Sequence, residues 1–127
     1  MVFIGEYQRI ENRRLKNDFT RSFLEDTEEK MENIYMTKNV YENLDLRIVA
    51  EVIHLLKRKI RKSSEENLDK FQVFEVEENK MIRRQEYPEE MEEHTLNDKF
   101  RKMNIWAVQG RDESQGRYWT IMFPEDY

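Results

Sequence analysis

The residues of this chain best suited to metal chemistry are its two histidines and a run of glutamates. His54 lies among apolar and basic residues, where a hydrogen-bonded histidine is far more common than a metal ligand. His94 follows four glutamates, but their spacing forms no HExxH motif and no facial triad. Four glutamates within five residues are more typical of a solvated acidic segment. The sequence therefore predicts no metal site.

The motifs of nucleophilic catalysis and of phosphate binding are also missing from the sequence. The chain has no cysteine, and its serines lie in polar segments without a GxSxG elbow. Its three glycines, Gly5, Gly110 and Gly116, form neither a P-loop nor a dinucleotide-binding fingerprint. We therefore expect a protein that is not an enzyme and that uses no cofactor.

A basic run, KRKIRK, gives nucleic-acid binding a place among the possible functions. The candidate contacts are Lys57, Arg58, Arg61 and Lys62. Exposed aromatic rings elsewhere could stack on bases. Against this, Glu65 and Glu66 follow the run, and the net charge of −5 repels phosphate overall. A solvated helix end that complements the helix dipole is the simpler interpretation, so nucleic-acid binding is kept as the alternative.

Composition predicts a small core beneath a heavily charged surface. Hydrophobic residues make up 38% of the chain, charged residues 39% and aromatic residues 12%. A length of 127 residues suits one ordinary domain. Neither a signal peptide nor an apolar stretch of about 20 residues is present. We expect a cytoplasmic protein without a membrane partner.

The segment from Asp45 to Lys62 has the clearest helical pattern in the chain. Apolar residues recur at i, i+3, i+4, i+7 and i+11, namely Val49, Val52, Ile53, Leu56 and Ile60. This spacing predicts a long amphipathic helix, capped by Asn43 or Asp45, whose apolar stripe must rest on another element.

Alternating and β-branched residues predict the strands that could cover this helix. The expected strands are residues 33–40 (ending in a turn at Asn39), 68–76, 80–87, 103–109 and 117–123. Residues 77–79 and 110–116 read as hairpin connections, and residues 89–102 read as either one helical turn or an irregular crossing. Together these elements predict an α+β fold, in which an antiparallel sheet of about five strands packs against one long helix.

The first 32 residues differ in kind from the remainder. Leu15, Phe19 and Phe23 recur at i, i+4 and i+8 between many charges, which predicts a helix over about 11–25. We therefore divide the chain into an N-terminal helical arm, 1–32, and a single domain, 33–127. The arm either packs on its own domain, the commoner arrangement, or docks on a partner.

Five segments in the same order link residues 34–127 to a known group of proteins. They are IYMTKNV, FQVFEV, IRRQEYP, the strand that contains Trp106, and the terminus YWTIMFPEDY. With these segments the chain resembles a family of short uncharacterised proteins from phages and other mobile elements of Gram-positive bacteria. It departs from that family at Asn39, where a glycine is usual, and in its longer 110–116 connection. The resemblance implies the fold and a mobile-element origin, and no activity.

A small acidic protein of this type is expected to act by binding another protein, such as a host or defence protein or a second copy of itself. Trp106 and Trp119 are of the residue type that anchors interfaces, although most of the aromatic residues near the C-terminal hairpin must belong to the core. Arg83, Arg84 and Glu86 beside Pro88 form a second candidate surface, because charges on a mid-sheet strand need either water or a partner. These five residues are the predicted protein-binding residues.

Overall fold

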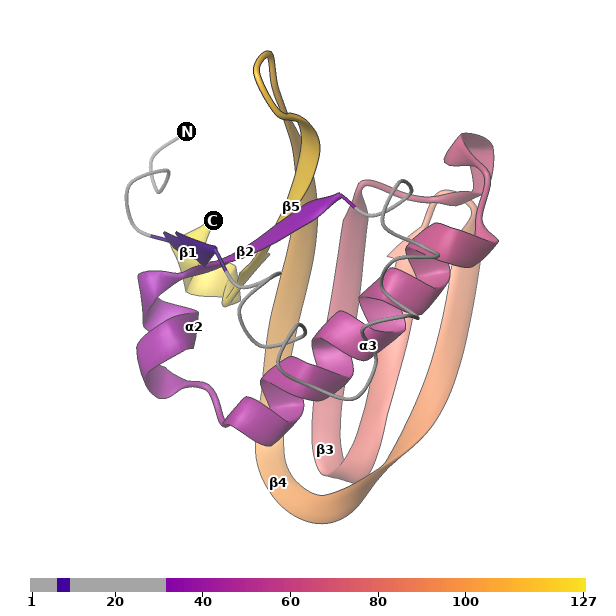
Figure 1. The fold of residues 1–127 in the computed structure, drawn as a ribbon. Helices are drawn as coiled ribbons and strands as arrows, with labels where there is room; N and C mark the ends of the chain where they lie inside the picture. The colour runs from indigo at the N-terminus through magenta and orange to yellow at the C-terminus, as the bar shows by residue number, and fades with distance from the viewer. Residues whose placement is uncertain (1–6, 10–31) are drawn as a thin grey trace, which may run out of the picture.

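The computed structural model describes residues 7–9 and 32–127. The elements are β1 (Tyr7–Arg9), β2 (Asn33–Thr37), α2 (Lys38–Asn43), α3 (Leu46–Lys62), η4 (Glu65–Asn67), β3 (Phe71–Glu86), β4 (Glu89–Asp112), β5 (Gly116–Met122) and η5 (Pro124–Asp126) (Figure 1). The protein is thus α+β, as predicted. The helix expected over 11–25 lies outside the described residues. Within these residues, no helix has the length and apolar character needed to cross a membrane.

The sheet is mixed, so the expectation of a purely antiparallel sheet is wrong. Its strand order is β1-β2-β5-β4-β3, with the three-residue β1 pairing with β2. β2 runs parallel to β5, while β4 pairs antiparallel with both β5 and β3. A parallel pair requires a long crossover connection. Here the crossover consists of both helices and the β3–β4 pair, which carry the chain from β2 back to β5.

β3 and β4 form one long ribbon, which replaces several shorter elements of the prediction. At the predicted connection, 77–79, β3 doubles back (Figure 1), so that Gln72 donates a hydrogen bond to Gln85 and Asp69 accepts one from the backbone N–H of Tyr87. Both arms nevertheless stay paired with β4 through a bulge, where the register shifts on either side of Glu78 and where Glu78 has a φ of 57°. The predicted strands 68–76 and 80–87 are thus two halves of β3, and residues 89–102 are part of β4. Both strands bend at this level (Figure 1). The chain reverses at Tyr87–Pro88, a cis peptide bond.

The helices begin at side chains that cap them, and the first of these caps corrects the prediction for β2. β2 ends at Thr37, whose hydroxyl accepts a 3.2 Å hydrogen bond from the backbone N–H of Val40 and starts α2. Asn39 therefore lies in α2 and not in a turn. Asp45 caps α3 by accepting a 2.8 Å bond from the backbone N–H of Arg47. Hydrogen bonds from the Arg47 side chain and backbone lower the pKa of Asp45 to about 2.

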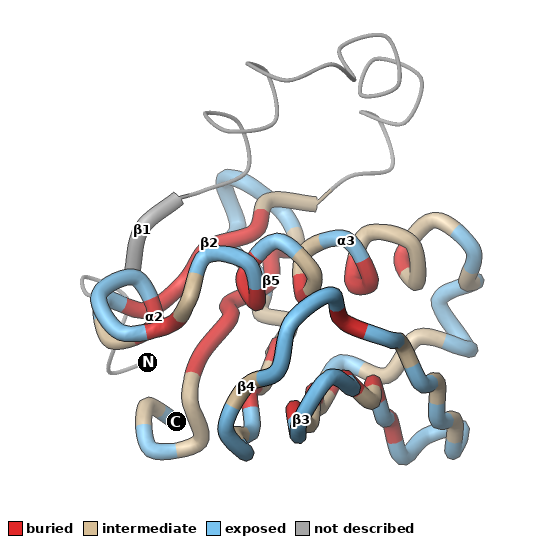
Figure 2. The backbone as a smooth tube through the Cα atoms, turned by 90° about the horizontal axis from the view of Figure 1, so that it is seen from below, coloured by how far each residue is buried: buried red, intermediate tan, exposed pale blue. Residues whose placement is uncertain are grey.

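The apolar stripe of α3 rests on one face of the sheet, which we call the inner face. Its buried residues are Ile48, Val49, Val52, Leu55, Leu56 and Ile60. They share one core with inner-face residues of β3, β4 and β5, including Phe74, Ile105 and Trp119, all of which are 0% exposed. Figure 1 shows α3 lying across the sheet, and Figure 2 shows the C-terminal end on the opposite side. Each such side chain contributes about 1.5–3 kcal/mol by burial.

The last hairpin is tighter than expected, because β4 extends to Asp112 and β5 begins at Gly116. Within it, Gly110 pairs with Tyr118, whose ring covers the glycine. A Cβ atom at Gly110 would lie 2.7 Å from Cζ of Tyr118. Tyr118 is itself buried and touches Tyr35 edge-on, with ring centroids 5.7 Å apart. The close approach therefore requires glycine at this position.

We expect Gly110→Ala to lower the free energy of unfolding by about 1–3 kcal/mol, because the added methyl displaces Tyr118. Urea titration followed by circular dichroism measures the loss. In a Tyr118→Leu background the same substitution should cost much less, since the clashing ring is absent. Equal costs in the two backgrounds would show that the ring does not constrain Gly110.

Candidate functional site

Two of the five predicted protein-binding residues lie inside the domain. Arg83 is 2% exposed and Trp119 is 0% exposed, and both point to the inner face. The bulge at Glu78 shifts the side-chain alternation of β3 and so turns Arg83 inward. Trp119 lies on β5, which is covered on both faces. Neither side chain is therefore accessible at the surface of the domain, and a binding role for the two residues stays a prediction.

The other three predicted residues, Arg84, Glu86 and Trp106, lie on the outer face, opposite α3. Successive residues of a strand point to opposite faces, so Arg84 faces away from buried Arg83, and Trp106 faces away from buried Ile105. Arg84 donates a 3.0 Å bond to Glu75, Glu86 is exposed, and Trp106 is half-buried. The structure thus places these three residues on one side of the sheet.

Trp106 belongs to a group of aromatic rings on this outer face. Its ring centroid lies 4.8 Å from that of Phe71 and 5.8 Å from that of Tyr127, and the Phe71 and Tyr127 centroids are 5.9 Å apart. All three contacts are edge-on, the favoured geometry. η5 holds Tyr127 in place, because Asp126 accepts bonds from the Thr37 hydroxyl at 2.8 Å and the Phe123 N–H at 3.0 Å. Tyr127 remains 66% exposed.

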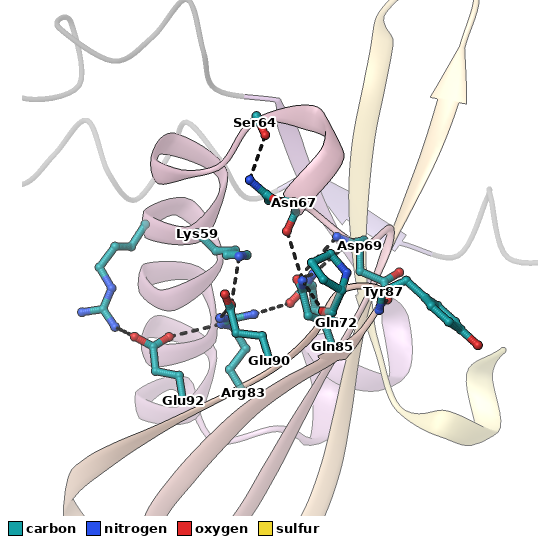
Figure 3. A network of polar contacts seen from close by, with 12 residues as sticks. Lys59, Ser64, Asn67, Asp69, Gln72, Arg83, Gln85, Tyr87, Glu90 and Glu92 are labelled. Carbon is teal, nitrogen blue, oxygen red and sulfur yellow. Dashed lines mark hydrogen bonds and ion pairs between the residues drawn. The ribbon is translucent and has the colours of Figure 1, made fainter.

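Tyr87 is a second exposed ring, on the turn that is tied to the start of β3. The carboxylate of Asp69 accepts bonds from the backbone N–H groups of Phe71 and Tyr87, at 3.0 and 2.9 Å, and so ties the β3–β4 turn to the start of β3. Figure 3 shows the Tyr87 side chain pointing away from α3. It is 77% exposed, more than any other large hydrophobic side chain of the described residues. We call Phe71, Tyr87, Trp106 and Tyr127 the outer aromatic patch.

Sequence reasoning identified Trp106 but missed the other members of the patch. The alternation of β3 carried a signal for Phe71, since Phe71 and Val73 occupy the face opposite Phe74 and Val76. Nothing in the sequence indicates that Tyr127 packs on Trp106, because this contact depends on how η5 folds back over the sheet. Tyr87 is adjacent to Pro88, which indicates a turn and hence exposure.

Arg83 is the centre of a polar network between the helix and the β3–β4 turn (Figure 3). It donates to Oε1 of Gln72 at 2.6 Å and to Oε1 of Glu92 at 3.2 Å, and it pairs with Glu90. Gln85 extends the network, accepting a 2.8 Å bond from Gln72 and donating to the backbone carbonyl oxygens of Asn67 and Pro88. The network satisfies every polar group that the bulge turns inward at these positions, as buried polar groups require.

The basic end of α3, the alternative nucleic-acid site, is partly neutralised by the same strand. Arg58 pairs with Glu92, and Lys59 lies 2.9 Å from Glu90. Lys57 and Arg61 are half-buried, whereas Lys62 is exposed. The glutamates of β4 therefore face the basic run across a tertiary contact, which no spacing in the sequence indicates.

A cavity of about 520 Å³ opens at this junction of α3 and the β3–β4 turn. Its wall carries four cationic side chains and two carboxylates, together with Ser63, Asn67, Pro88 and Met91. The six charged residues are Arg58, Lys59, Lys62, Arg83, Glu90 and Glu92.

The two histidines lie apart from this cavity. His54 is exposed on α3, and Nε2 of His94 contacts the carboxylate of Glu51. Among the described residues, no group of three or more His, Asp or Glu side chains is arranged to hold a metal ion. The His94 contact thus serves as a link between α3 and β4.

The network around Arg83 makes the stability of the fold depend on pH in the acidic range. Hydrogen bonds from Lys59, and then from Arg83, hold the pKa of Glu90 below its ordinary value of 4.5. A carboxylate with a lowered folded-state pKa stabilises the fold above its unfolded pKa and loses that contribution as the pH falls through the folded value. We expect the urea midpoint to fall as the pH drops below 4.5, and to fall less steeply in Glu90→Gln. Equal slopes in both proteins would remove Glu90 from this account.

No protein-family model, no curated protein and no solved structure matches this chain.

Proposed function

We propose that this protein is a non-enzymatic accessory protein of a phage or mobile element, which acts in the bacterial cytoplasm by binding another protein through the outer aromatic patch. The observation that carries the proposal is the exposure of Tyr87 and Tyr127, 77% and 66%, together with half-buried Trp106, whose ring contacts that of Tyr127. Tyrosine and tryptophan are the residues that most often dominate binding energy. Apolar groups gathered on a surface are typical of interaction sites.

The charges around the patch indicate the chemistry of the partner. Glu86, Glu89 and Glu125 are exposed and lie within two residues of Tyr87 or Tyr127 in the chain, and the whole chain carries −5. Complementary potentials favour a partner with an apolar centre and a basic rim. A second copy joined symmetrically would place the same carboxylates against each other. We therefore propose that the patch binds a basic surface of a different protein.

Nucleic-acid binding receives less support from the geometry. One of the four cations assigned to it, Arg58, already pairs with Glu92, and Lys59 in the same basic run pairs with Glu90. A polyanion approaching this end would also meet Glu90 and Glu92, whose side chains are 42% and 35% exposed. Both facts reduce the local attraction for phosphate chains.

The test is capture from a Gram-positive bacterial lysate with the immobilised full chain and two variants. Tyr87→Ser/Tyr127→Ser removes both exposed rings of the patch. Tyr41→Ser removes a ring that is 54% exposed on α2 and is not a member of the patch, and it is the matched control. We expect a protein with a basic surface to be captured by the wild type and the control, and to be lost from the double variant.

Two outcomes would contradict the proposal. One is a captured protein that the double variant retains. The other is binding of a labelled oligonucleotide that weakens steeply with added salt and is lost in Lys62→Met, which would favour the nucleic-acid alternative.

A further inference from the structure

The cavity between α3 and the β3–β4 turn contains more positive than negative charge. Four cations against two carboxylates leave a surplus of +2, within a chain whose net charge is −5. The carbonyl end of α3 offsets only about half a unit of this surplus. The surplus is therefore a local feature that opposes the overall charge of the protein.

The side chains of two of these cations have little exposure to water, which is unusual for a group of like charges. The side chain of Arg83 is 3% exposed and that of Lys59 is 9% exposed, while their shared partner Glu90 is 42% exposed. Removing cations from water is costly, and partly solvated carboxylates compensate incompletely. An anion bound in the cavity would offset the remaining cost of removing these cations from water.

Donors remain available in the cavity for such an anion. An ammonium group has three N–H donors, and one described contact, to Glu90, involves Lys59. No ion pair joins Lys62 to any described residue, and the hydroxyl of Ser63 lies on the same wall. These groups come from consecutive turns at the end of α3 and can converge on one oxyanion.

We propose that this cavity binds the phosphate group of a small phosphorylated molecule. A charge of −2 matches the surplus of +2. The volume of about 520 Å³ exceeds what one phosphate fills and lies in the range of small-molecule sites. The remaining space borders Met91 and Pro88, which can contact an organic group. Glu90 and Glu92 in the cavity wall disfavour a polymer of phosphates.

Calorimetric titration of the full chain with phenyl phosphate, with inorganic phosphate and with phenol, at constant ionic strength, tests the proposal. Phenyl phosphate should bind more tightly than inorganic phosphate, and phenol should not bind. Lys62→Met should weaken phenyl phosphate binding about tenfold, because a charge-assisted hydrogen bond is lost. Lys38→Met, which removes an exposed lysine on α2, should leave it unchanged.

A substitution that removes a negative charge from the cavity distinguishes a role in binding phosphate from a purely structural role of its charged residues. Glu90→Gln raises the surplus to +3, so it should strengthen phenyl phosphate binding even though it weakens the network. Three results would overturn the proposal: no heat with phenyl phosphate, equal affinity in Lys62→Met and wild type, or tighter binding of an oligonucleotide than of phenyl phosphate.

Discussion

Replacing Trp119 with alanine is expected to remove about 3–5 kcal/mol of stability, the cost of truncating a large core side chain. Trp119 is 0% exposed in the shared core beneath α3, and its indole N–H donates a 2.8 Å bond to Glu32. The cavity left behind is lined by a helix and a sheet that are held apart by other side chains. Since domains of this size are stable by about 5–15 kcal/mol, the loss is a large share of the total stability.

Urea titration measures the loss of unfolding free energy, and two further variants serve as controls. Trp119→Phe keeps most of the packing and loses the bond to Glu32, so it should cost clearly less than alanine. Trp106→Ala removes a half-buried ring from the outer face and should leave the core intact. If Trp106→Ala cost as much as Trp119→Ala, the assignment of one tryptophan to the core and the other to the surface would be wrong.

The double substitution Glu90→Gln/Glu92→Gln has the second largest expected effect, a loss of about 3 kcal/mol. It leaves Arg83, with its 3% exposed side chain, as a buried charge without a counter-charge among its described contacts. This value is at the low end for breaking a buried pair, because water screens carboxylates that are 42% and 35% exposed.

Removing the cation of Arg83 instead of its carboxylate partners should lower the free energy of unfolding by less. Arg83→Met deletes the buried charge and leaves mainly the buried Oε1 of Gln72 without a donor, for a loss of about 1 kcal/mol. Urea titrations of both variants at neutral pH decide the order. A larger loss in Arg83→Met than in the double variant would mean that the carboxylates do not serve to neutralise Arg83.

The elements that the sequence predicted well are those governed by local periodicity. The stripe of α3 buries Val49, Val52, Leu56 and Ile60 as its spacing requires, and Asp45 caps the helix. The alternation around Trp106 and Trp119 gave the correct faces within β4 and β5. Short-range patterns of this kind depend only on the geometry of one helix or strand.

What the sequence could not supply depends on one bulge and one crossover. Glu77, Glu78 and Asn79 have the chemistry of a turn, and a bulge with a positive φ uses the same residue types. That single shift turns Arg83 inward and joins two predicted strands into β3. The parallel pairing of β2 with β5 is likewise a property of the whole chain path, which no local pattern encodes.

The candidate site likewise combines features that local sequence patterns predict with features that only tertiary contacts determine. Trp106 and Glu86 were predicted from residue type and lie on the outer face. The neighbours that make a patch of them, Tyr87 and Tyr127, reach it through the Asp69 bridge and through η5. Tertiary contacts therefore define the patch, while the sequence supplies its chemistry.

Site-specific photocrosslinking tests the central claim, that the outer aromatic patch contacts the partner, most directly. A benzophenone amino acid would replace Tyr87, Tyr127 or, as the control, Tyr41, each in the full chain mixed with the captured protein. The account predicts adducts from the first two positions and none from the third. An adduct from Tyr41 alone, or equal yields from all three positions, would contradict it.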